Sequence, residues 1–279
     1  MELSKMIKQH TNSPQGKTFL KFDYQMLMEY EQDVQREFFT IKALPCSDKR
    51  QKVLDIQPEI LPVTDFSYGS DGFGNRFIYG AVKEAHKNFW YHVKGRIEIG
   101  QILFEDIATE EEIFLFRHSY GLNKPGKGLI KYFDAIRFEL EENTYVNAIY
   151  LMHRLHQDFI YRKGITNVNT SAEEAWNMGG GVCQDYAHIF IALLHLAEIP
   201  ARYVTGITLG EGESHAWVEI LYRGRWIGMD PTNDVLVARS HIKFGHGRDA
   251  FDCMINRGLL YGGGAQKQKI MVMVEEEPQ

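Results

Sequence analysis

The hydrophobic pattern of the chain changes its period near the middle, and this change limits the fold more than any other feature. In the first part, short segments rich in aromatic and β-branched residues are separated by turn residues; they lie at 19–24, 38–44, 76–82 and 89–99. Such spacing predicts the antiparallel strands of a β-sandwich. From Thr144 onward, apolar residues recur at steps of three and four, which indicates a helix. The chain is therefore expected to be an α+β protein.

The stretch between the two patterns fits neither of them. Residues 105–128 end in a segment rich in asparagine, proline and glycine, which interrupts regular structure. We therefore predict two domains. The first is an N-terminal antiparallel β-domain over residues 1–115, and the second is a core over residues 116–279 that includes a C-terminal strand.

Three consecutive glycines divide two predicted helices in the second half. Overlapping capping boxes within Thr170–Glu174 predict a short helix that starts near residue 171 and stops at Gly179–Gly181. A second, apolar helix is expected from about Cys183 until shortly before Pro200. Strands are then expected over residues 201–209, 214–222 and 225–229.

The position of Cys183 at the start of a helix gives this thiol a special environment. The amino end of a helix carries unpaired N–H groups and a partial positive charge, which favour thiolate over thiol. The same N–H groups can receive an oxyanion as it develops. The preceding glycines let backbone and substrate approach closely.

His215 and Asp230 are expected on the two arms of one hairpin. If Arg223 and Gly224 form a two-residue turn, Trp217 lies opposite Asp230, and His215 lies two residues further along the same face. The hairpin then holds a carboxylate beside an imidazole, which is the arrangement that orients a general base. A turn longer by one residue would place His215 and Asp230 on opposite faces of the hairpin.

Each of these residues taken alone has an ordinary structural explanation. A cysteine that opens an apolar helix commonly packs as a small apolar side chain, and an aspartate before a proline commonly makes a turn. Together, a cysteine after a glycine-rich turn, a histidine strand and an aspartate that ends the next strand form a more specific pattern.

The segments around these residues resemble the Cys, His and Asp boxes of the transglutaminase-like superfamily. In order and spacing they are similar to its prokaryotic branch, whose members are described as cysteine proteases. The three boxes are GGGVCQDYAH (179–188), SHAWVEI (214–220) and WIGMDPTND (226–234). Residues 50–62 and 71–76 resemble the β-domain that precedes the core in that branch, and residues 241–266 resemble its tail. One departure lies at 251–255, where an Asp-Val-x-Pro run is expected.

This resemblance implies a papain-like transglutaminase core, in which the cysteine helix packs on an antiparallel sheet. It also implies that Cys183 is the nucleophile, that His215 is general base and acid, and that Asp230 orients the imidazole. The expected reaction is acyl transfer on peptide or carboxamide bonds through a thioester, with hydrolysis favoured. The alternatives are a protein-glutamine amine acyltransferase and a non-catalytic binding module of the same fold. Neither a metal nor an organic cofactor is implied.

The composition and charge of the chain limit which partners it can bind and where in the cell it is expected. A formal net charge of −6 argues against a nucleic-acid partner, and no apolar run is long enough for a membrane span. The three cysteines, Cys46, Cys183 and Cys253, cannot all pair, and the N-terminus has no apolar export signal, so a cytoplasmic location is expected. A peptide or protein substrate is expected, and the oligomeric state stays open.

Several histidines cluster in sequence without a recognised metal-binding spacing. These residues are His153 and His156 on one helix, and His241 and His246 with Cys253 near the end of the chain. Because no CxxC or HExxH motif accompanies them, no metal site is predicted.

Overall fold

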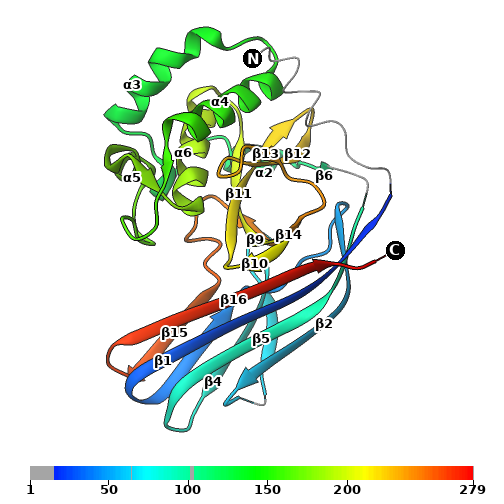
Figure 1. The fold of residues 1–279 in the computed structure, drawn as a ribbon, viewed down its shortest axis with the longest axis vertical. Coiled ribbons are helices and arrows are strands. Elements are labelled where there is room, and N and C mark those ends of the chain that lie inside the picture. Colours follow the sequence, from blue (N-terminus) through cyan, green and yellow to red (C-terminus); the bar gives the residue numbers. More distant parts are fainter. Residues whose placement is uncertain (1–15, 64, 101–103, 279) are drawn as a thin grey trace.

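Two antiparallel sheets organise the chain. The computed structural model describes residues 16–63, 65–100 and 104–278. Figure 1 shows the larger sheet at one end of the molecule, and the smaller sheet at the other end with α3, α4, α5 and α6. The fold is therefore α+β, as predicted, with a β-rich N-terminal region ahead of a mixed core.

The bounds of the elements follow the chain in order. The strands of the larger sheet are β1 (Thr18–Ile41), β2 (Gln51–Leu61), β3 (Ser67–Ser70), β4 (Arg76–Val82), β5 (His86–Ile99), β10 (Gly210–Gly212), β15 (Asn256–Gly262) and β16 (Gln266–Glu276). The strands of the smaller sheet are β6 (Phe104–Ile107), β9 (Ala201–Thr208), β11 (His215–Tyr222), β12 (Arg225–Asp230), β13 (Val235–Leu236) and β14 (His241–Gly247). A parallel pair is formed by β7 (Ile160–Tyr161) and β8 (Gly180–Gly181). The α-helices are α2 (Glu110–Leu115), α3 (Lys127–Ile136), α4 (Thr144–Asp158), α5 (Ala172–Met178) and α6 (Cys183–Leu196).

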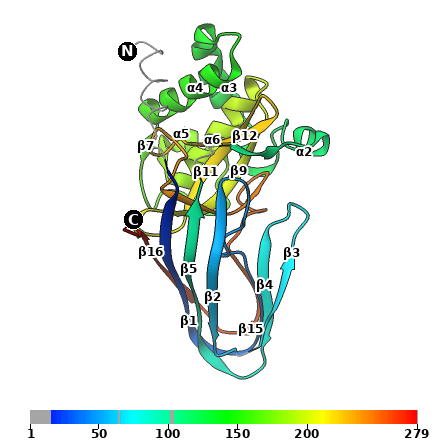
Figure 2. The ribbon, with the colours of Figure 1, turned by 90° about the vertical axis from the view of Figure 1, so that its right-hand side faces the viewer.

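The long strand β1 takes part in both layers of the larger sheet. Its first half lies between β5 and β16, and its second half lies between β4 and β15. The pairing with β5 shifts between Glu29 and Val34, and this irregularity is where the sheet turns back on itself. Figure 2 shows the two layers, with β2, β5 and β16 on one side and β3 and β4 on the other. The expected sandwich is thus a single folded sheet.

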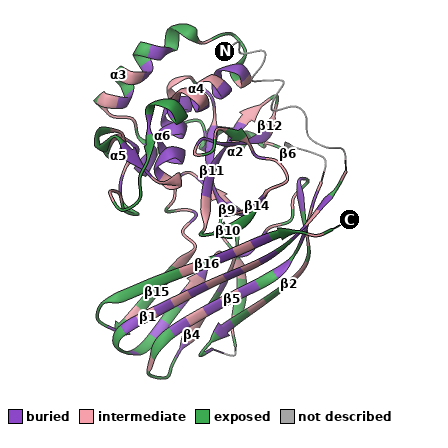
Figure 3. Ribbon diagram, viewed as in Figure 1, coloured by how far each residue is buried: buried purple, intermediate pink, exposed green. Residues whose placement is uncertain are grey.

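Alternating side chains along β1 build the core between these layers. The inward residues of its first half are Leu20, Phe22, Tyr24, Met26 and Met28, all buried. The alternation is visible along β1 and β5 in Figure 3. This period of two is the reason why the segment is a strand with one apolar face.

The second core lies between the helices and the smaller sheet. The strand order of the smaller sheet is β13, β12, β11, β9 and β14, and β6 pairs with the outer side of β12. The apolar helix α6 packs against β9 and β11, and α4 and α5 pack against α6. The structure therefore has the predicted cysteine-bearing helix on an antiparallel sheet.

The division at residues 115 and 116 does not describe how the strands are shared. β15 and β16 follow the core in sequence, yet they pair with β1 in the larger sheet, and β6 precedes the boundary yet pairs with β12. The C-terminal strand assigned to the core therefore belongs to the N-terminal sheet. The physical reason is that β1 offers hydrogen-bonding groups on both edges, and β5 and β4 occupy only one of them.

None of the helices within the described ranges has the length and apolar character needed to cross a bilayer.

Candidate active site

A cavity of about 890 Å³ opens where the start of α6, the smaller sheet and β16 meet. Cys183 and His215 both line it, and so do Gln268 and Ile270 of β16. Two of the three predicted site residues therefore face one cavity. Asp230 lies behind His215 and is completely buried.

The glycines before Cys183 each serve the turn in a different way. Gly179 has a φ of 70° and ends α5 in the left-handed conformation, which a glycine adopts without strain. Gly180 lies so close to β7 that a side chain there would meet the Ile160 carbonyl oxygen at 2.8 Å. α6 then begins at Cys183, as predicted.

Asp185 fixes the turn from which the thiol projects. Its carboxylate accepts a hydrogen bond from the Val182 N–H at 2.7 Å and another from the Thr166 hydroxyl at 2.7 Å. Burial raises the pKa of Asp185, and these two hydrogen bonds oppose the rise. The amides of Cys183 and Gln184 lie in the first turn of α6, where N–H groups have no partner within the helix.

The hairpin of β11 and β12 has the predicted register. Arg223 and Gly224 have φ values of 51° and 73°, as a two-residue turn with two left-handed positions requires. Val218 pairs with Met229, so the same register sets Trp217 opposite Asp230. His215 therefore lies on the same face as the carboxylate.

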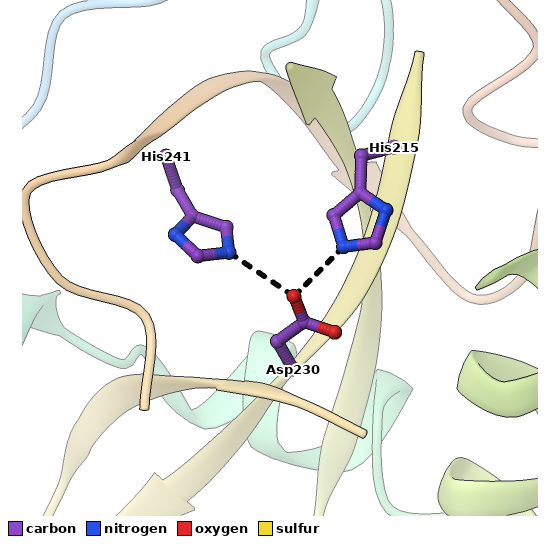
Figure 4. A group of neighbouring side chains, drawn as sticks. All are labelled: His215, Asp230 and His241. Carbon is purple, nitrogen blue, oxygen red and sulfur yellow. Dashed lines mark hydrogen bonds and ion pairs between the residues drawn. The ribbon is translucent and has the colours of Figure 1, made fainter. Parts of the chain in front are cut away.

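The His215 ring stands between Asp230 and Cys183. Its Nε2 lies 2.8 Å from Asp230 Oδ2, which leaves Nδ1 for the thiol (Figure 4). Burial lowers the pKa of His215, but hydrogen bonding and charge from Asp230 and Cys183 outweigh burial and raise the pKa to about 10. The imidazolium form is thus favoured beside the thiol.

Asp230 is held as an anion by a set of donors around both oxygens. Oδ1 accepts from the Thr232 and Asn233 amides at 3.0 Å and 3.3 Å, and Oδ2 also accepts from the Asn233 side chain at 2.7 Å. Burial opposes ionisation, but the hydrogen bonds from His215 and His241 and the positive charge of His215 keep the pKa of Asp230 well below its usual range.

His241 is a member of this cluster that the sequence did not assign to it. Its Nε2 lies 3.2 Å from the same Oδ2 that His215 contacts. His241 belongs to β14, which pairs with β9 and is separated from β12 by two strands, β11 and β9. No local pattern in the sequence signals this meeting, because it depends on how the sheet curls.

The donor atoms of His215, Asp230 and His241 lie within 4.8 Å of one another, a spacing that a metal ion could share. Both imidazoles, however, hydrogen-bond directly to the carboxylate. Hydrogen bonding therefore accounts for the arrangement, and we assign neither a metal nor a cofactor to it.

Two family models match the chain in consecutive regions. The Transglutaminase-like superfamily model matches residues 134–231, which include Cys183, His215 and Asp230. The Bacterial transglutaminase-like N-terminal region matches residues 20–98.

Curated relatives match a smaller part of the chain. An uncharacterized protein of Mycobacterium leprae is 37% identical over 124 residues, which are 41% of this chain and 44% of that protein. An uncharacterized protein of Mycobacterium tuberculosis is 36% identical over 127 residues, or 40% of each chain. The chain thus spans less than half the length of these relatives.

One solved structure shares the fold over nearly the whole chain. The crystal structure of a "Putative Cysteine Protease" from Cytophaga hutchinsonii superposes with a TM-score of 0.80 at 20% identity, and covers 95% of this chain and 92% of that one. At this identity the likeness concerns the fold.

Proposed function

Because the chain belongs to the transglutaminase-like superfamily, we propose that it is a cysteine-dependent acyl-transfer enzyme acting on peptide or carboxamide bonds. Cys183 is the nucleophile, His215 moves the proton, and Asp230 orients the imidazole. The observation that carries the proposal is the His215 ring bonded to a buried carboxylate on one side and facing the Cys183 thiol on the other.

The first half-reaction forms a thioester. The Cys183 sulfur attacks the carbonyl carbon of the substrate, and the carbonyl oxygen becomes an oxyanion near the amides at the start of α6. His215 then gives its Nδ1 proton to the leaving amine, and the C–N bond breaks. Asp230 keeps the ring in place through Nε2 throughout this step.

The second half-reaction releases the acyl group. Neutral His215 removes a proton from water, the hydroxide attacks the thioester carbon, and the C–S bond breaks to give a carboxylic acid and the thiolate. A lysine amine in place of water would give transamidation. We favour hydrolysis because the prokaryotic branch is described as proteolytic and the solved structure of similar fold carries the name "Putative Cysteine Protease".

The substrate and the location belong to the same proposal. A cavity of about 890 Å³, lined by residues of the core and by Gln268 and Ile270 of β16, has room for a segment of peptide chain. Within the described residues, Cys46, Cys183 and Cys253 form no disulfide with one another, which is compatible with the cytoplasmic location that we propose.

A trapping experiment tests the reaction. The protein is mixed with a tryptic digest of casein, the reaction is stopped in acid, and intact mass identifies any acyl adduct on Cys183; the Cys183→Ala variant is the control. Repeating the reaction in heavy-oxygen water with a biotinylated primary amine separates the two acceptors. Heavy oxygen in new carboxyl groups indicates hydrolysis, and biotinylated peptide indicates transamidation. If neither an adduct nor a product forms with any peptide, the protein is a binding module.

A further inference from the structure

His241 meets Asp230 although their strands are not neighbours. β11 and β9 lie between β12 and β14, so a flat sheet would separate the outer strands by about 14 Å at 4.8 Å per step. The side chains instead approach to 3.2 Å, so the sheet must curl around this face. Figure 4 shows both imidazoles aimed at one carboxylate oxygen.

The surroundings of His241 fix which ring nitrogen carries its proton. Nε2 faces the Asp230 carboxylate, which can only accept, so Nε2 carries the proton; the Ser240 hydroxyl lies 3.0 Å from Nδ1 and can donate to it. The ring is 3% exposed, and the edge of Trp217 packs against it with ring centroids 5.2 Å apart. His241 is thus a buried side chain whose donor points at the proposed catalytic carboxylate.

The charged groups around His241 favour its neutral form. Burial lowers the pKa of His241, and the charges of His215 and Arg50 lower it further against the attraction of Asp230. Arg50 lies ahead of β2 and donates to the His241 carbonyl oxygen at 3.0 Å. A neutral His241 ring with its proton on Nε2 donates a hydrogen bond to Asp230. Because this ring carries no charge, it does not repel the imidazolium of His215.

We propose that His241 is a positioning residue of the active site, whose Nε2–H holds the Asp230 carboxylate in the orientation that directs the His215 ring toward Cys183. This inference rests on the proposed function of the site. Thr232 and Asn233 hold the carboxylate from its own loop, whereas His241 ties it to the opposite end of the curled sheet.

Two substitutions at position 241 separate positioning from packing. In His241→Gln the amide nitrogen takes the place of Nε2 and can still donate to Asp230. In His241→Asn the amide nitrogen takes the place of Nδ1 and is too far from Asp230 to donate a hydrogen bond. We expect turnover to fall about 10- to 100-fold in the asparagine variant and to stay near wild type in the glutamine variant.

Alkylation of Cys183 by iodoacetamide supplies a readout that does not depend on a substrate. Its rate from about pH 4 to about pH 9 reports the thiolate fraction, which His215 stabilises. We expect the midpoint of the rate profile to rise by about one pH unit in His241→Asn and to equal the wild-type midpoint in His241→Gln. His86→Asn is the matched control, because the buried His86 side chain pairs with Glu37 at 2.9 Å in the larger sheet, away from this cluster.

The outcomes distinguish the inference from the function on which it rests. If wild-type Cys183 reacts no faster than Cys46, the proposed function fails. If wild-type Cys183 is reactive but folded His241→Asn keeps the wild-type profile and turnover, only the positioning role is overturned. Should both variants at 241 misfold, Ser240→Ala removes the hydrogen bond that orients the His241 ring through Nδ1, and an unchanged profile there also counts against the inference.

Discussion

At the scale of single residues, Asp230 determines the chemistry that the site can support. Five donor groups point at its two oxygens, so protonation would break hydrogen bonds that the anion accepts. The side chain is also fully buried, which means that its charge needs His215 as a cationic partner. An aspartate in this setting holds an imidazolium rather than exchanging protons with it.

Replacing the three proposed catalytic residues should give unequal losses. Cys183→Ala removes the sulfur and should abolish acyl-enzyme formation, and His215→Ala should be nearly as severe because His215 is the base that contacts the thiol. Asp230→Asn keeps the shape and removes the charge, so we expect turnover to fall about 10- to 1000-fold, less than the roughly 10⁴-fold seen for a serine triad. The losses should not be additive, since the residues act as a unit.

Product formation measured for each variant, with circular dichroism to confirm folding, checks this order. Wild-type turnover in folded Cys183→Ala protein would remove the basis of the catalytic assignment.

The raised pKa of His215 should appear in the pH dependence of stability. In a Cys183→Ala background the thiol no longer titrates, so His215 is the proton-binding group of interest. Its pKa is about 10 in the folded wild type and about 6.5 in an unfolded chain, and Asp230 continues to raise it in the variant. The folded state therefore keeps a proton that the unfolded state loses above pH 6.5.

It follows that the contribution of His215 to the free energy of unfolding is complete below about pH 6.5. The contribution declines as the pH rises toward the pKa of His215 in the folded protein, by at most about 1.4 kcal/mol per pH unit. Urea unfolding at several pH values measures it. Adding His215→Gln should flatten the dependence in this window, and an equal slope in both variants contradicts the assignment.

At the scale of elements, a buried charge cluster ties three strands of the smaller sheet. Glu219 of β11 accepts from Arg202 of β9 at 2.7 Å and from Lys243 of β14 at 2.9 Å and 3.0 Å. Each of the three residues is at most 3% exposed, and the Arg202 guanidinium also lies 4.4 Å from the centre of the Trp226 ring. The cluster lies on the same face of β11 as His215, so it supports the sheet that carries the site.

Removing the carboxylate that both cations contact should be costly. We expect Glu219→Gln to lower the free energy of unfolding by about 3–5 kcal/mol, because the buried Lys243 ammonium and Arg202 guanidinium lose the carboxylate that both contact, although Arg202 keeps Glu112 at 3.2 Å. The matched control is Glu213→Gln, whose partner Lys163 lies 3.5 Å away with both side chains about two-thirds exposed. That change should cost below about 1 kcal/mol. Equal midpoints of chemical denaturation for the two variants would contradict the role of burial.

Elements with a local signal were predicted well. The glycine turn and the charge-favouring start of α6 place Cys183 at the first position of the helix, and the turn at Arg223–Gly224 sets the register that brings His215 to Asp230. The helix α3 was missed, although Leu129, Phe133 and Ile136 give it a buried face, because the glycines around it indicated a loop. His241 could not be assigned, since only the curl of the sheet brings it to the carboxylate.

At the scale of the whole molecule, the two regions share strands and one cavity. The chain leaves the larger sheet after β5, builds the core, and returns through β15 and β16 to pair with both halves of β1. Gln268 and Ile270 of β16 then line the same cavity as Cys183. Sequence periodicity shows that such strands exist but carries no information on their partner, because a half-buried edge strand looks the same beside either sheet.

The shared strands predict that the N-terminal region cannot fold without the end of the chain. A variant that stops after Ile255 lacks β15 and β16, which leaves one edge of β1 without its partner along nearly its whole length. It also uncovers the inward side chains of Phe22 and Tyr24, which are buried beside Val272 and Val274. We expect aggregation or loss of the cooperative thermal transition, since an unpaired apolar strand edge associates readily.

A chain that stops after Glu277, which retains the contacts of that residue with Arg96, should melt like the full chain. Differential scanning calorimetry with gel filtration compares the two, and a monomeric, cooperatively melting protein that ends at Ile255 would show that the two regions are energetically independent.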